Sequence, residues 1–126
     1  MKAMNGQPAK PRVLVVDDER VIADTLAIIL NQNGFEASAV YTGTAAVDRA
    51  RDTRPDLIIS DVIMPDMNGI EAAIRIRKIL PACKILLFSG QAATADLLEK
   101  ARAQGHEFEI LAKPVHPQDL LAKLRN

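Results

Sequence analysis

The chain has 126 residues, of which 48% are hydrophobic and 3% aromatic, so we expect one domain with a core of Ile, Leu, Val and Ala. Sixteen basic residues balance sixteen acidic ones, which argues against a broad nucleic-acid footprint. Cys83 is the single cysteine, and the sequence contains neither a secretory signal nor an apolar stretch near the roughly 20 residues that span a bilayer. These features make a cytoplasmic location the default expectation.

Residues 1–11 carry two prolines, a glycine and two lysines, and predict a disordered lead before a domain of residues 12–126. From Arg12 onward, short apolar runs alternate with runs of helical periodicity. The predicted strands are residues 12–16, 36–40, 57–60, 84–88 and 107–111. The predicted helices are residues 19–33, 44–52, 69–80, 92–104 and 118–125, with stops at Gly34, Pro81 and Gly105.

This alternation predicts an α/β fold, in which a parallel sheet is covered by helices on both faces. The unbroken apolar character of Arg12–Val16 is typical of a strand buried on both sides. In such a sheet the carboxyl ends of neighbouring strands meet at one crevice, where ligands bind. Residues that follow the strands are therefore the candidates for a functional site.

Four charged residues stand where predicted strands end: Asp17, Asp18, Asp61 and Lys113. Carboxylates that share one point repel each other unless a cation lies among them, and Mg²⁺ prefers such oxygen ligands. A lysine beside them suits chemistry on a phosphoryl group. Taken alone, the acidic run 17–19 has a second interpretation as the cap of the following helix.

Ser89 and Gly90 follow the fourth predicted strand. A hydroxyl at this place can donate a hydrogen bond to a phosphoryl oxygen, and a glycine after it leaves a path to the site. Four of the five strand ends thus carry polar groups of complementary chemistry.

Four motifs, taken together and in this order, resemble those of a bacterial response-regulator receiver domain. They are Val15–Glu19, Ser60–Gly69 with its Asp, Met-Pro and Met-x-Gly, Phe88–Gly90, and Lys113-Pro114. The resemblance covers about residues 12–125 and is closest to single-domain, chemotaxis-type regulators. It implies a flavodoxin-like doubly wound (βα)5 fold with a five-stranded parallel sheet in the order 2-1-3-4-5.

The resemblance also implies roles for the site residues. Asp61 would accept a phosphoryl group from a sensor histidine kinase or a phosphotransfer protein. Mg²⁺ would be bound by Asp18, Asp61 and the backbone carbonyl of Ile63, and by Asp17 mainly through a metal-bound water. Lys113 would pair with the phosphoryl oxygens.

In this family Ser89 would be the switch hydroxyl that moves toward the phosphate, and the Lys113-Pro114 peptide would be cis. The phosphorylated domain would change conformation and control a downstream protein target. We expect it to assist its own phosphorylation and dephosphorylation without being an enzyme in the usual sense, and to contact neither nucleic acid nor membrane.

Two positions depart from the family pattern. Ile110 occupies the place of the usual switch aromatic, and the nearby aromatic residue is Phe108. Ile63, two residues after the expected phosphoacceptor, has a side chain that cannot hydrogen-bond the water that attacks an acyl phosphate. We therefore expect slow autodephosphorylation.

Other classes of protein fit less well. A haloacid-dehalogenase phosphatase needs a second Asp two residues after its nucleophile, and the run 17–19 lacks that spacing. A flavodoxin would need a hydroxyl-rich phosphate loop after the first strand, where this chain is acidic. A receiver-like adaptor that works without phosphorylation stays open as the alternative, because of Ile110.

Overall fold

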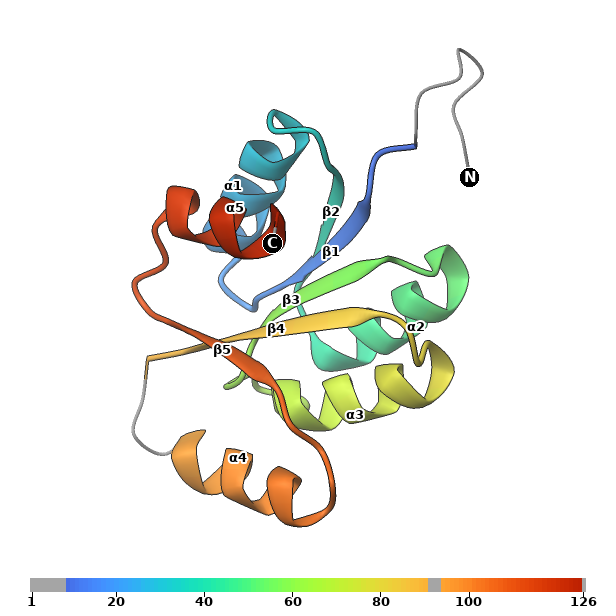
Figure 1. Cartoon of the computed structure of the whole chain (residues 1–126), viewed down its shortest axis with the longest axis vertical. Coiled ribbons are helices and arrows are strands. Elements are labelled where there is room, and N and C mark those ends of the chain that lie inside the picture. The colour runs from blue at the N-terminus through green and yellow to red at the C-terminus, as the bar shows by residue number, and fades with distance from the viewer. Residues whose placement is uncertain (1–8, 91–93, 126) are drawn as a thin grey trace.

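The computed structural model describes residues 9–90 and 94–125. Five strands alternate with five helices and form one parallel sheet in the order β2-β1-β3-β4-β5 (Figure 1), which confirms the predicted fold and strand order. Most of the predicted lead 1–11 lies outside the described residues. In the part of the chain that the structure describes, no helix is long and apolar enough to cross a membrane.

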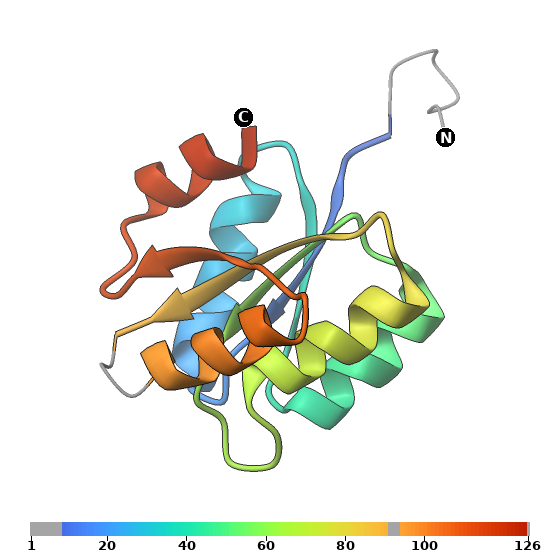
Figure 2. The ribbon, with the colours of Figure 1, turned by 60° about the horizontal axis from the view of Figure 1, so that its bottom comes forward.

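The sheet is built from strands whose limits follow the apolar runs closely. They are β1 (Arg12–Val16), β2 (Glu36–Val40), β3 (Leu57–Asp61), β4 (Lys84–Ser89) and β5 (Glu109–Ala112). Strand β1 pairs with both β2 and β3 and so lies inside a sheet that helices cover on both faces, which explains why its residues after Arg12 are apolar and buried. In Figure 2 the arrowheads of the strands point to one edge, so the strand ends predicted to carry the site lie together.

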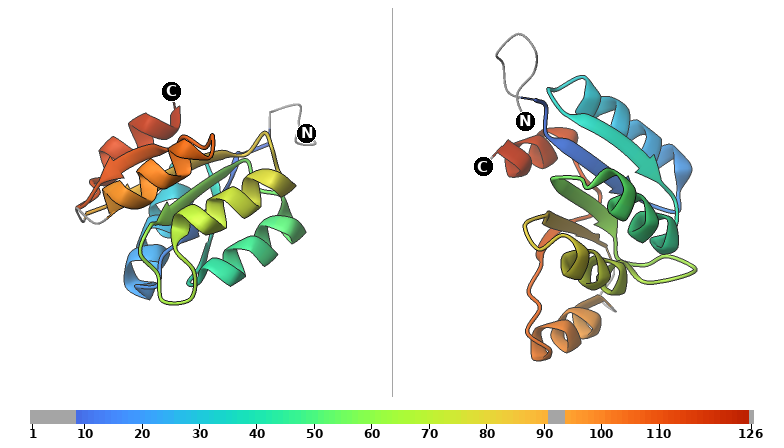
Figure 3. Two further views of the ribbon diagram at one scale, coloured as in Figure 1. Left: turned by 90° about the horizontal axis from the view of Figure 1, so that it is seen from below. Right: turned by 90° about the vertical axis from the view of Figure 1, so that its right-hand side faces the viewer.

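Five helices cover the sheet in two layers. They are α1 (Arg20–Asn31), α2 (Gly43–Thr53), α3 (Gly69–Ile79), α4 (Thr94–Ala103) and α5 (Pro117–Arg125). Helices α1 and α5 cover one face, and α2, α3 and α4 cover the other (Figure 3). Side chains that alternate along the strands enter two separate cores, one around Leu14, Ile58 and Leu87 and the other around Val15, Ile59 and Phe88.

Helix ends follow local chemistry. Helix α1 ends two residues before the predicted limit, and Gly34 follows with φ of 92°, a conformation that glycine adopts without strain. Thr42 and Asn68 cap α2 and α3 by accepting hydrogen bonds from the third amide beyond them, at 3.0 and 2.8 Å. The predicted start of the fourth helix, Ala92, lies outside the described residues.

The fifth strand begins at Glu109, two residues later than predicted. The preceding residues contact helix α3 instead of β4. The guanidinium of Arg77 donates to the carbonyl of Glu107 at 3.1 Å and lies 4.2 Å above the centre of the Phe108 ring. This tertiary contact overrides the local strand propensity of the segment.

Candidate functional site

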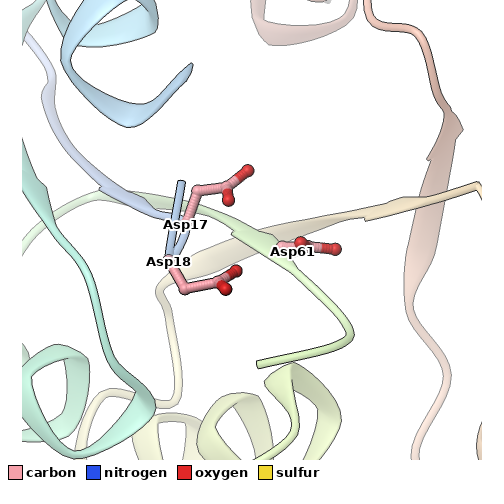
Figure 4. Close-up of side chains that lie close together, drawn as sticks. All are labelled: Asp17, Asp18 and Asp61. Carbon is pink, nitrogen blue, oxygen red and sulfur yellow. The ribbon is translucent and has the colours of Figure 1, made fainter. Parts of the chain in front are cut away.

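Three carboxylates meet at the carboxyl edge of the sheet. Asp17 and Asp18 follow β1, and Asp61 is the last residue of β3, which is the neighbour of β1 (Figure 4). Each residue offers a carboxylate oxygen, and these oxygens all lie within 4.8 Å of one another. The structure therefore brings Asp17 and Asp61 together, although they are 44 positions apart in the sequence.

Lys113 reaches the same point from the end of β5. Its Nζ lies 3.0 Å from Oδ2 of Asp61, and both side chains are largely buried. Burial lowers the pKa of the Lys113 ammonium, but the hydrogen bond to Asp61 and the negative charges of Asp61, Asp17 and Glu19 outweigh it, so the pKa is raised. The lysine is thus a fixed cation at neutral pH.

Asp17 is fully buried and only half satisfied. Its Oδ1 accepts a hydrogen bond from the Glu19 amide at 2.9 Å, so the helix-cap interpretation is correct for one oxygen. Its Oδ2 has no hydrogen-bond partner among the described residues. Burial is the main cause that raises the pKa of Asp17, with a smaller contribution in the same direction from the Asp61 carboxylate.

The chemistry of these groups fits a divalent cation. Three carboxylates and one ammonium leave a net charge of −2 when all are ionised, since −3 + 1 = −2. A buried oxygen without a partner is costly, and a hard cation is the ligand that would satisfy it. Asp18 is exposed and lines a cavity at this edge of the sheet, whereas Asp17 is buried.

A cavity of about 750 Å³ opens onto these groups. Its charged and polar lining includes Asp18, Asp61, Ser89 and Lys113, and its apolar lining includes Ile22, Leu26, Ile63, Phe88 and Val115. The cavity is therefore wide enough for a substrate group to approach Asp61.

Ser89 ends β4 beside the cavity, and its hydroxyl contacts the hydroxyl of Thr94, the first residue of α4. No pattern in the sequence pointed to Thr94, because the contact depends on where α4 starts in space. Gly90 lines the cavity and has a second role: a Cβ there would lie 3.0 Å from Cβ of Lys113. The missing side chain thus makes room for the lysine.

The loop after Asp61 is held by glycine and by hydrogen bonds. The Gly69 amide donates to the carbonyl of Val62 at 2.7 Å, and a Cβ on Gly69 would lie 2.0 Å from the carbonyl oxygen of Asp61. Only glycine allows α3 to start this close to the end of β3. The Ile63 amide lies 3.4 Å from Oδ1 of Asp61, while the Ile63 side chain is 41% exposed.

Asp66 ties the same loop to helix α2. Its carboxylate accepts hydrogen bonds from the amides of Gly43 and Thr44, both at 3.0 Å, and from the Thr44 hydroxyl at 2.8 Å. The amide of Thr44 is the main cause that lowers the pKa of Asp66 to about 2. Sequence reasoning missed this residue, since its partners are more than 20 positions away.

The Lys113-Pro114 peptide is cis, as the resemblance implied. Ile110 is half-buried and packs with Phe108 against the core on the α2–α3 side of the sheet. Phe108 lies under Arg77, so the aromatic ring near the usual switch position is engaged with α3.

The fold and the site define a doubly wound α/β domain with three carboxylates and a lysine gathered at the carboxyl ends of its strands. Residues 13–125 match the response regulator receiver domain, and the chain belongs to this family. Members are switches of two-component signal transduction that are phosphorylated on an aspartate, interact with histidine kinases and bind Mg²⁺ at an acidic pocket.

Individual relatives agree with this assignment. The chemotaxis protein CheY of Thermotoga maritima is 34% identical over 114 residues, which cover 90% of this chain and 93% of the relative. The solved structure of CheY4 from Vibrio cholerae has a TM-score of 0.80 and 32% identity and covers 93% of this chain and 98% of that one.

A probable transcriptional regulatory protein of Mycobacterium tuberculosis, TcrX, is 32% identical over 125 residues, which cover 99% of this chain and 52% of the relative. Other relatives of similar identity are described as DNA-binding response regulators. This chain spans about half the length of these curated relatives.

Proposed function

We propose that Asp61 is the phosphoacceptor of this receiver domain, which we take to comprise residues 12–126. The observation that carries the proposal is the 3.0 Å ion pair between Lys113 and Asp61 inside the cluster of three carboxylates. A carboxylate attacks a phosphoryl group poorly unless nearby positive charge compensates the negative oxygens. Lys113 supplies one such charge at the nucleophile itself.

Asp17, Asp18, Asp61 and the backbone carbonyl of Ile63 are the groups we propose to hold Mg²⁺. The unpartnered Oδ2 of Asp17 and the net negative charge of the cluster support this assignment. When bound, Mg²⁺ neutralises charge on the phosphoryl oxygens.

In the proposed transfer, an oxygen of Asp61 forms a bond to phosphorus while the phosphorus–nitrogen bond of a phosphohistidine breaks. The electron pair of the broken bond stays on the imidazole of the donor. Lys113 pairs with the phosphoryl oxygens, and the Ser89 hydroxyl donates a hydrogen bond to one of them. The new negative charge draws both side chains toward it, and this shifts the domain between two conformations.

The proposed partners are a sensor histidine kinase or phosphotransfer protein as donor and a protein as downstream target. The domain assists its own phosphorylation and dephosphorylation. We expect no nucleic-acid contact through this domain, because the 16 basic and 16 acidic residues of the whole chain cancel. The cytoplasmic location expected from the sequence stays a prediction.

The test is incubation of the protein with Mg²⁺ and acetyl phosphate, followed by intact-mass measurement, with Asp61→Asn as the matched control. A phosphoryl adduct on the wild-type protein and none on the variant is the expected result. A folded wild-type protein that binds Mg²⁺ and gains no adduct would contradict the proposal and favour the adaptor that works without phosphorylation.

A further inference from the structure

A second hollow lies away from the phosphorylation site, between helices α3 and α4. It has a volume of about 340 Å³, and the two helices are neighbours on the same face of the sheet (Figure 3). Its lining includes four charged and two large apolar residues: Glu71, Arg75, Lys78, Lys100, Ile74 and Leu97. We call this hollow the α3–α4 groove.

The α3–α4 groove has an apolar floor and a positive rim. Ile74 on α3 and Leu97 on α4 are half-buried and both line it. Lys78 on α3 and Lys100 on α4 are exposed, and neither has an ion-pair partner among the described residues. The two lysines therefore place unneutralised charge on opposite walls.

One pair on the rim is already neutral. Arg75 contacts Glu71 at 3.0 Å through an i,i+4 ion pair on α3. Three basic residues and one acidic residue thus leave the lining with a net charge of +2, since 3 − 1 = 2. On a chain whose formal net charge is zero, this local excess favours an acidic occupant.

Both walls of the groove begin at the phosphorylation site. Helix α3 starts at Gly69, which packs against the carbonyl of Asp61. Helix α4 starts at Thr94, whose hydroxyl contacts that of Ser89. Asp61 and Ser89 therefore each contact the first residue of one wall of the groove.

The two walls are anchored differently. Helix α3 buries five residues, Gly69, Ile70, Ala72, Ala73 and Ile76. Among the described residues, α4 buries Thr94 and Ala101. Because α4 has less buried apolar surface, it is the wall that moves at lower cost.

We propose that the α3–α4 groove binds an acidic segment of a partner protein, with apolar side chains on the floor and carboxylates at Lys78 and Lys100. Phosphorylation tightens this binding, because a Ser89 hydroxyl drawn to the phosphate changes its contact with Thr94, the first residue of α4, and shifts this wall of the groove toward the segment. The coupling rests on the proposed function, whereas the groove and its charge do not. Two lysines beside an apolar floor suit a peptide better than a duplex, whose binding needs a larger set of phosphate contacts.

The test begins with a random-peptide phage library selected on the phosphorylated protein. We expect the enriched peptides to combine acidic and apolar residues and to perturb NMR signals of α3 and α4. The double variant Lys78→Glu/Lys100→Glu should lower the affinity of a selected peptide about tenfold, as expected for two exposed charge pairs reversed in sign. Arg49→Glu, which reverses an exposed charge on α2, is the matched control and should leave the affinity within about twofold.

Phosphorylation should raise the affinity of the selected peptide about fivefold or more, the lower end of typical coupling between sites. Peptides without acidic residues, equal affinity for the double variant, or shifts confined to other elements would overturn the groove assignment. So would a duplex DNA or a second copy of the chain that occupies the groove in preference to the peptides. Intact mass separates the two proposals: a normal phosphoryl adduct without groove binding refutes this inference alone, and a missing adduct refutes the proposed function.

Discussion

Gly69→Ala tests whether the close approach of α3 to β3 positions the phosphoacceptor. The added Cβ would lie 2.0 Å from the carbonyl oxygen of Asp61 and 3.1 Å from Oγ of Ser60. An ordinary carbon–oxygen contact is roughly 3.4 Å, so the backbone would have to separate by about 1.4 Å. The obstacle is main chain, which cannot turn away as a side chain does.

The expected change in the free energy of unfolding for Gly69→Ala is the sum of two opposing effects. Gly69 is the first residue of α3 and its φ is not positive, so alanine by itself would stabilise the helix by up to about 1 kcal/mol. Overpacking against fixed backbone costs about 1–3 kcal/mol or more, which outweighs that gain. We therefore expect a net loss of about 2 kcal/mol in the free energy of unfolding.

The same displacement moves Asp61 relative to Lys113. A misplacement near 1 Å lowers the rate of a positioned reaction about 100-fold, so phosphorylation by acetyl phosphate should slow by about this factor. Urea unfolding measures the first effect, and the rate of adduct formation by intact mass measures the second.

Gly34→Ala is the matched control, because Gly34 has φ of 92° and a Cβ added there would meet no other atom within 4 Å. It should lower stability by about 1 kcal/mol through backbone strain while leaving the phosphorylation rate unchanged. A Gly69→Ala protein with wild-type stability and wild-type phosphorylation rate would refute the reasoning.

Three further predictions concern the loop and the site. Asp66→Ala should lower stability by about 1 kcal/mol after allowance for its exposure, measured by urea unfolding. Because the pKa of Asp66 is lowered to about 2, its stabilising effect is full above about pH 4 and is lost as the pH falls toward 2. The free energies of unfolding of wild type and variant should therefore converge in acid, and a difference that stays constant with pH would count against this. Asp17→Asn should raise stability in EDTA at pH 7 by about 1 kcal/mol, because it removes a buried negative charge beside two other carboxylates. It should also abolish most stabilisation by Mg²⁺ in thermal melts, and unchanged Mg²⁺ stabilisation would argue against the metal assignment. Ile63→Asn should speed decay of the acyl phosphate about fivefold, because the asparagine adds one hydrogen bond to the attacking water in the transition state. A slower decay in this variant would contradict the expectation that Ile63 slows autodephosphorylation.

The sequence predicted the central strands β1, β3 and β4 well because they are buried on both faces. The limits of β1 match the prediction residue for residue, since an unbroken apolar run is the direct consequence of such burial. The limits of the edge strand β2 match as well, although this strand is only partly buried. The predicted limits of α2 and α3 differ from the observed ones by one residue at some ends, because neighbouring residues could also serve as the helix caps that Thr42 and Asn68 provide.

Where the prediction was wrong, a contact between distant elements decided the outcome. The late start of β5 results from the contacts of Arg77 with Glu107 and Phe108, which lie 30 or more positions away. No pattern in a window of ten residues contains that information.

The chemistry of the site was determined by the sequence, because carboxylates, a hydroxyl and a lysine at strand ends converge in any parallel sheet of this kind. Their working geometry was decided by the tertiary structure. The burial of Asp17, the ion pair of Lys113 with Asp61 and the contact of Ser89 with Thr94 each depend on how separate elements pack. Such pairings require packing distances of a few ångströms, which residue type and spacing do not specify.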